Sequence, residues 1–133
     1  MVTLTTKNSE LIDLINGLFN VQDLQGMRFG LVVSKNIRIL QTELKDLEEA
    51  SKASDAFVAL SQKANSLDGD TEALELLEKE NEELVKERRV QMEEMEKMME
   101  DAVEVELHEI LESLLPENIT AAQIINIDKL IKV

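Results

Sequence analysis

The sequence lacks cysteine, tryptophan and tyrosine altogether, and its only aromatic residues are three phenylalanines. Without cysteine there are no disulfide bonds and no thiolate metal sites, which is typical of proteins from a reducing compartment. Without Trp and Tyr the chain also lacks the side chains that most often anchor binding hot spots. The core must therefore be aliphatic, and Leu, Ile, Val and Met side chains suit the packing of helices.

Long apolar runs are absent as well. No stretch approaches the roughly 20 apolar residues that a transmembrane helix needs. The first residues, MVTLTTKNSEL, lack the basic start and the apolar segment of a signal peptide. We therefore expect no membrane association and a cytoplasmic location.

The charge is strongly of one sign, because 28 acidic residues oppose 14 Lys and Arg and leave a net charge of −14. Such a charge disfavours direct binding to nucleic-acid backbones and to anionic membranes. Residues 1–40 hold four bases and three acids, whereas residues 71–101 hold five bases and twelve acids. This asymmetry suggests a packed base that carries a solvated arm.

The length predicts one helical domain, residues 1–133, with a modest core. Apolar spacing and capping residues predict about five helices. Gly30 lies inside the second helix and predicts a close packing contact there. Two of the helices are expected to follow N-caps at Asn8 and Ser54. The others are expected at Met27–Ser51, at about 72–101, and at Ala121–Lys132, where Thr120 and Gln123 form a capping box.

The helix expected at about 72–101 would be roughly 45 Å long, which is enough for it to project from a domain of this size. A heptad seam through residues 74 to 102 has six apolar positions out of nine. The other three positions are Asn81, Arg88 and Gln91, in the middle of the seam. The pattern is that of a poor coiled coil, but it fits an amphipathic helix that is packed at both ends and more hydrated between them.

The segment VEVELHEI, residues 103–110, alternates apolar and polar side chains with the period of a half-buried strand. A single strand leaves its backbone hydrogen-bonding groups unpaired, and only Met1–Thr6 shows a similar alternation. We therefore predict a two-stranded antiparallel ribbon between these segments. The predicted fold class is mainly α (α+β), with about five helices, one of them long, and this small ribbon.

The methionines near the end of the long helix form a soft, adaptable cluster of a kind that some proteins use to bind partners. The alternative is that they pack against the second helix or the strand pair of the same chain. The only adjacent pair of basic residues lies just before them, within a charged run that could be a docking helix or simply a solvated face. The candidate interaction surface consists of Met92, Met95, Met98, Met99, Arg88 and Arg89.

No catalytic, cofactor-binding or metal-binding residues are predicted, and we expect that the protein is not an enzyme. His108 lies on the polar face of the predicted strand, where exposure without a role is expected. The segment DGDTE, residues 68–72, begins like a calcium loop, but its glycine comes second and position 12 is Lys79. A turn followed by a helix cap at Asp70 or Thr71 is therefore expected. Phosphate-loop, Ser/His/Asp and H-E-x-x-H motifs are absent.

The layout resembles small helical proteins of uncharacterised function encoded by tailed bacteriophages. The resemblance lies in the segments KNSELIDLINGL, FGLVVSKNIRILQTELKDLEEA, VEVELHEI and LLPENITAAQIINIDKLI. It implies a phage accessory or virion-associated role and assigns no functional residues. The architecture is also similar to that of prefoldin-like chaperones, whose long helices project from a small β platform, although one long helix here replaces their matched pair.

These observations predict a non-enzymatic, oligomeric protein–protein interaction or assembly protein, with a protein partner and no cofactor. The alternative is an acidic inhibitor or nucleic-acid mimic that binds a basic host protein, such as a defence or transcription factor. The net charge of −14 is the feature that motivates this alternative.

Overall fold

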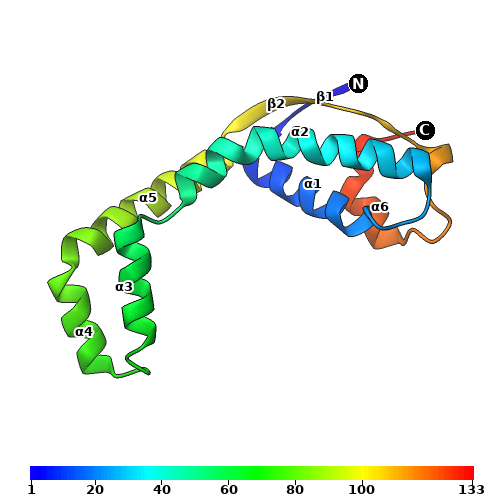
Figure 1. Ribbon diagram of the computed structural model, residues 1–133. Coiled ribbons are helices and arrows are strands. Elements are labelled where there is room, and N and C mark those ends of the chain that lie inside the picture. Colours follow the sequence, from blue (N-terminus) through cyan, green and yellow to red (C-terminus); the bar gives the residue numbers. More distant parts are fainter. The chain divides into compact units, whose positions relative to one another are not determined.

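A computed structural model describes all residues, Met1–Val133, and is mainly helical with six α-helices (Figure 1). The elements in chain order are β1 (Val2–Lys7), α1 (Asn8–Val21), α2 (Met27–Ser51), α3 (Asp55–Asn65), α4 (Thr71–Glu80), α5 (Glu82–Glu100), β2 (Ala102–Leu107), β3 (Ile110–Leu111), η1 (Glu112–Leu114), α6 (Ala121–Ile127), η2 (Asp128–Leu130) and β4 (Ile131–Lys132). The predicted fold class, mainly α with a small antiparallel ribbon, is confirmed.

The contacts divide the chain into two compact units. Unit 1 comprises Met1–Asp46 and Met99–Val133, and unit 2 comprises Leu47–Met98. Helices α2 and α5 each continue through a boundary between the units. The division therefore does not test the expectation that residues 1–133 form one domain, and each unit is described by itself.

In unit 1, strands β1 and β2 form the predicted antiparallel ribbon (Figure 1). Val2 pairs with Leu107, and Leu4 pairs with Val105. Val105 and Leu107 are buried, whereas the residues between and beside them on β2 are exposed glutamates. The two-residue alternation of the sequence therefore places one face of the ribbon on the core and the other in water.

The ribbon and its flanking helices enclose an aliphatic core in which Phe29 is the only aromatic side chain. Helix α1 buries one broad face, while Asp13, Asn16 and Asn20 on its other side are exposed. The buried members of this core are Leu11, Leu14, Ile15, Leu18, Val21, Phe29, Val33, Ile37, Leu40, Val105, Leu107, Ile110, Ile127 and Leu130.

Asn36, in α2, is the one fully buried polar side chain of this unit. Its Nδ2 donates to the carbonyl oxygen of His108 at 2.9 Å, and its Oδ1 accepts from the N–H of His108 at 2.8 Å. His108 directly follows Leu107, the last residue of β2 that pairs with β1. The side-chain amide therefore replaces the strand partner that the ribbon no longer supplies at this residue.

The prediction that His108 is exposed is wrong, since the residue is half-buried. Its backbone is held by the carboxamide of Asn36 at the place where β2 ends and the chain turns towards β3. Sequence alternation alone could not show this, because the partner lies 72 residues away in a helix.

The close packing contact expected at Gly30 is found instead at Gly17, in α1. A Cβ at Gly17 would lie 2.9 Å from the carbonyl oxygen of Asn126, in α6, so only glycine allows this approach of the two helices. A Cβ at Gly30 would meet nothing within 4 Å. The spacing of glycines in a sequence does not show which helix faces a neighbouring backbone.

The helix expected at Ala121–Lys132 is shorter than predicted. Its capping box of Thr120 and Gln123 is confirmed, but α6 ends at Ile127, and β4 pairs in parallel with β3 through Ile131 and Ile110. The segment is rich in isoleucine, a β-branched residue that favours strands over helices. The predicted strand at 103–110 is likewise divided into β2 and β3.

Two of the predicted helix starts are confirmed and one is wrong. The side chains of Ser54 and Asp70 accept hydrogen bonds from backbone N–H groups in the first turns of α3 and α4. The expected N-cap at Asn8 is instead at Lys7. Because Lys7 still pairs with Ala102 in the ribbon, α1 begins directly where β1 ends.

Lys7 also forms an ion pair with Glu100, with Nζ 2.7 Å from the carboxylate oxygen. This hydrogen bond and the attraction of the carboxylate raise the pKa of Lys7 above its ordinary value of 10.5. Both side chains are more than half exposed, so solvent screens the pair and its contribution to stability is small. That contribution is present at neutral pH and is lost as pH rises through the raised pKa.

Unit 2 contains α3, α4 and most of α5, with α3 lying beside α4 (Figure 1). The continuous helix expected at about 72–101 is wrong, because it is interrupted at Asn81, where φ is −118° and ψ is 31°. The Asn81 side chain donates to the carbonyl oxygen of Leu77 at 2.9 Å. Asparagine side chains compete with the helical backbone in this way, which accounts for the break.

We expect Asn36→Ala to lower the free energy of unfolding by about 2–4 kcal/mol, because it removes two hydrogen bonds and leaves the backbone groups of His108 without partners. Asn65→Ala, at an exposed position at the end of α3, is the matched control and should change stability little. Urea denaturation followed by circular dichroism measures both variants. An Asn36→Ala protein as stable as the wild type would contradict this role of Asn36.

Candidate functional site

Two of the polar residues of the expected seam, Arg88 and Gln91, contact the carboxyl end of α2 within unit 2. The Arg88 guanidinium donates to the carbonyl oxygen of Ser51 at 2.8 Å and to Oε1 of Gln91 at 2.8 Å. Nε2 of Gln91 donates to the carbonyl oxygens of Ala50 and Lys52, at 2.7 and 2.9 Å. Two side chains of α5 thus hold three successive carbonyl groups where α2 ends. We call this cluster the α2 cap.

Electrostatics favours this arrangement. The last turn of α2 contains no basic residue, although the carboxyl end of a helix carries a partial negative charge. Arg88 supplies the positive charge that the helix itself lacks. Its guanidinium also lies 5.7 Å from the ring centre of Phe57, close enough for a cation–π contact. Arg88 is therefore engaged by a carbonyl group, an amide and an aromatic ring of its own chain.

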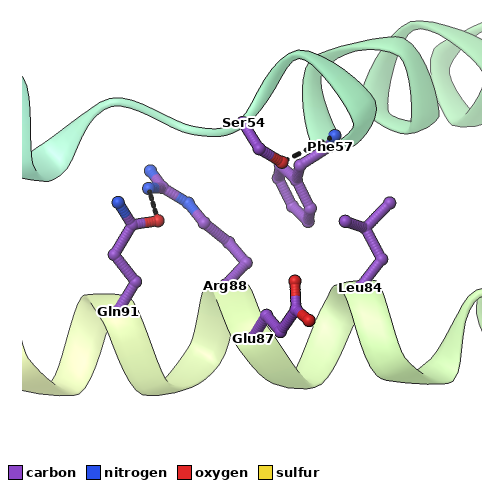
Figure 2. A pocket seen from close by; sticks show the side chains of 6 residues that line it. All are labelled: Ser54, Phe57, Leu84, Glu87, Arg88 and Gln91. Carbon is purple, nitrogen blue, oxygen red and sulfur yellow. Dashed lines mark hydrogen bonds between the residues drawn. The ribbon is translucent and has the colours of Figure 1, made fainter.

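A pocket of about 240 Å³ lies beside the α2 cap (Figure 2). Arg88 and Gln91 form one end of it, and Leu84 and Phe57 contribute apolar walls. Ser54 also lines the pocket, with its hydroxyl oxygen accepting from the N–H of Phe57 at 3.2 Å. Arg88, Gln91 and Ser54 thus complete helix termini, at the end of α2 and the start of α3, and Glu87 adds a carboxylate to the lining.

A second pocket, of about 230 Å³, lies between α3 and α4 and extends to α5. Its lining is mostly apolar, with Ser61 and Glu78 as its polar members. We call it the α3–α4 groove, and Phe57 borders both this groove and the pocket beside the α2 cap. The other residues that line the groove are Leu60, Ala64, Leu74, Leu77 and Val85.

The methionines of the candidate interaction surface differ in exposure. Met92 is 45% exposed, whereas Met95 is buried, and Met98 and Met99 are half-buried. Met99 also belongs to unit 1, while the other three belong to unit 2. Of the four methionines, Met92 is thus the one with a largely accessible side chain.

The two basic residues of the candidate surface also separate. Arg88 is half-buried in the α2 cap, whereas Arg89 is exposed and lines a shallow pocket with Glu78, Glu82 and Lys86. Adjacent residues on a helix point about 100° apart, so one arginine can face the protein while the next faces water.

Sequence reasoning missed the partners of Arg88, but a signal was present. Asn81, Arg88 and Gln91 interrupt the expected apolar seam, and each donates to backbone carbonyl oxygens at helix ends or breaks. Polar residues at seam positions could therefore have been interpreted as ligands for helix termini. Which termini they serve depends on contacts between distant segments.

No family model, curated protein or solved structure matches the chain. None of the helices combines the length and apolar character that crossing a membrane requires. No group of three or more Asp, Glu and His side chains converges in a way that could hold a metal ion.

We expect Arg88→Ala to lower the free energy of unfolding by about 1–2 kcal/mol, because the end of α2 loses a charged hydrogen-bond donor. Arg89→Ala is a matched control with the same change of charge at the neighbouring exposed position, and it should have little effect. Urea denaturation measures stability, and hydrogen exchange should show faster exchange at the start of α3 for Arg88→Ala alone. Equal behaviour of the two variants would refute the assignment.

Proposed function

We propose that this protein is a non-enzymatic protein–protein interaction or assembly protein that forms homo-oligomers through unit 2. The observation that carries the proposal is the poor burial of apolar side chains in this unit. Leu47, Leu77 and Met95 are its only buried hydrophobic residues, and α3 buries none. Association with another chain would remove apolar surface from water and so stabilise the complex.

The exposed apolar side chains of unit 2 support this proposal. Val58 is 43% exposed, Leu76 58%, Val90 46% and Met92 45%, and they lie on three different helices. Single exposed apolar residues are normal on a protein surface. Here they accompany an apolar groove, the α3–α4 groove, whose side chains are in part accessible. Together these features suit a helical arm whose apolar surface is completed by a partner.

The biological setting that we propose rests on the resemblance of several segments to small helical proteins of tailed phages. On that basis the protein is a phage accessory or virion-associated assembly protein, present in the host cytoplasm or in the virion.

Sedimentation velocity tests the self-assembly. We expect species heavier than the 15.0 kDa chain, with a fraction that increases with concentration. Val58→Ser combined with Leu76→Ser should weaken association about tenfold, since apolar contact area is lost. Ile125→Ser, at a 68% exposed residue of unit 1, is the control and should leave association unchanged. A single 15.0 kDa species up to about 100 µM would overturn the proposal.

A second candidate function, an acidic inhibitor or nucleic-acid mimic directed at a basic host protein, is favoured by the carboxylates of unit 2. All fifteen Asp and Glu residues of this unit are exposed, against seven Lys and Arg, which leaves a net charge of −8. The three ion pairs of the protein all belong to unit 1. These carboxylates are therefore available to an oppositely charged surface.

An amphipathic helical peptide of lysine and leucine is a suitable probe for this second function, with a glutamate and leucine peptide as control. Fluorescence anisotropy should show binding of the basic peptide alone, and the affinity should fall at least about tenfold between low and high salt because the contacts are screened. Affinity that does not depend on salt would count against an electrostatic inhibitor.

A further inference from the structure

The exposed face of α2 in unit 1 carries a row of basic residues that is unexpected in so acidic a chain. Arg28, Lys35 and Arg38 are all exposed, and their spacing places them on one side of the helix together with Leu31, which is 52% exposed. No Asp or Glu occurs between Leu24 and Thr42. We call these four residues the basic stripe.

The cations of the basic stripe have no carboxylate partner in their own chain. The three ion pairs of the protein join Lys7 to Glu100, Lys129 to Glu10 and Lys132 to Glu109. Arg28, Lys35 and Arg38 are in none of them, although acids outnumber bases two to one in the sequence. Three exposed, unpaired cations beside an exposed leucine are suited to an acidic surface with an apolar centre.

Helix α5 carries a surface of this kind in the part that belongs to unit 2. Glu83, Glu87 and Glu94 are exposed and lie on one side of the helix with Val90, which is 46% exposed. We call these four residues the acidic stripe. None of its carboxylates takes part in an ion pair.

The two stripes have complementary order. From Arg28 the basic stripe proceeds with steps of three, four and three residues, and its second member is apolar. From Glu94 backwards the acidic stripe proceeds with steps of four, three and four, and its second member is also apolar. The total lengths differ by one residue, about 1.5 Å along a helix.

In an antiparallel arrangement of the two helices, the apolar residues therefore face each other and each cation faces a carboxylate. The facing pairs are Arg28 with Glu94, Leu31 with Val90, Lys35 with Glu87, and Arg38 with Glu83. In a parallel arrangement Leu31 would face Glu87, and Lys35 would face Val90. Only the antiparallel order avoids burying a charge against an apolar side chain.

We infer that the basic stripe of one copy docks antiparallel on the acidic stripe of a second copy. This inference rests on the proposed self-assembly and adds to it a contact between α2 of one copy and α5 of the other. A second copy is the occupant because each chain carries both complementary surfaces, always in equal amount. At physiological salt the Debye length is about 8 Å, so repulsion between the acidic chains as a whole is screened while contacts within the docked pair persist.

Docking of this kind joins two different surfaces, so a docked pair retains one free acidic stripe on one copy and one free basic stripe on the other. Such heterologous contacts form rings if they close and filaments if they do not. The contact is small and its charges lie at a surface, so each step is weak and assembly depends on concentration.

Charge exchange between two variants tests the inference in sedimentation velocity at fixed physiological salt. One variant carries Arg28→Glu, Lys35→Glu and Arg38→Glu, and the other carries Glu83→Lys, Glu87→Lys and Glu94→Lys. Each variant alone should associate at least about tenfold more weakly than the wild type, because like charges face each other. An equimolar mixture should regain association, because each variant then meets its opposite.

Lys63→Glu combined with Lys79→Glu and Lys86→Glu is the matched control. It makes the net charge as negative as the reversal of the basic stripe does, but changes only exposed lysines outside that stripe. Association should be retained, and its loss would assign the effect to general repulsion and overturn the inference. Circular dichroism confirms that each variant is folded.

The remaining outcomes separate this inference from the proposed function. A wild-type protein that is monomeric at all concentrations contradicts the proposed self-assembly, and the docking with it. A wild type that associates while both variants associate equally well overturns the docking alone. If the two folded variants do not associate when they are mixed, the docking is also overturned. The basic stripe would then be assigned to a different acidic partner.

Discussion

The constraint on which the rest of unit 1 depends is that the backbone N–H and C=O groups of β2 must be hydrogen-bonded where the chain passes the core. The N-terminal strand β1 meets this requirement for Ala102–Leu107, and the side chain of Asn36 meets it for the next residue, His108. Five helices, α1 to α5, lie between the two strands in the chain. Pairing of the strands therefore closes a long loop of the chain. Helices α1 and α2 of unit 1 belong to this loop, whereas α6 follows β2.

Unit 2 is held together in another way. It has few buried hydrophobic residues. A polar cluster instead joins α5 to the end of α2, because Arg88 and Gln91 donate to the terminal carbonyl groups of α2. Hydrogen bonds to charged donors are directional, so they fix how the chain leaves a helix even where little apolar area is buried. Because unit 2 buries few apolar side chains, others remain accessible. These accessible side chains are the ones that the proposed function uses for binding.

The exposed charges of the protein are separated by sign, and both proposed functions depend on this separation. Unit 2 carries exposed carboxylates without ion pairs, and the basic stripe of α2 carries exposed cations without ion pairs. The two proposed functions, binding a basic foreign surface and docking on another copy, would use the same carboxylates. The two modes would compete, so an inhibitor of this type would be held in an assembled form until a more basic partner displaced the second copy.

The sequence by itself determined the mainly helical fold class, the bounds of α2, the caps at Ser54, Asp70 and Thr120, and which two segments pair in the ribbon, because these depend on local periodicity and on backbone groups that must be paired. Only the tertiary structure decided the close approach at Gly17, the strand at Ile131 and the partners of Asn36 and Arg88. In each of these cases the deciding contact joins residues far apart in the chain. Local propensity does not depend on such contacts and therefore could not reveal them.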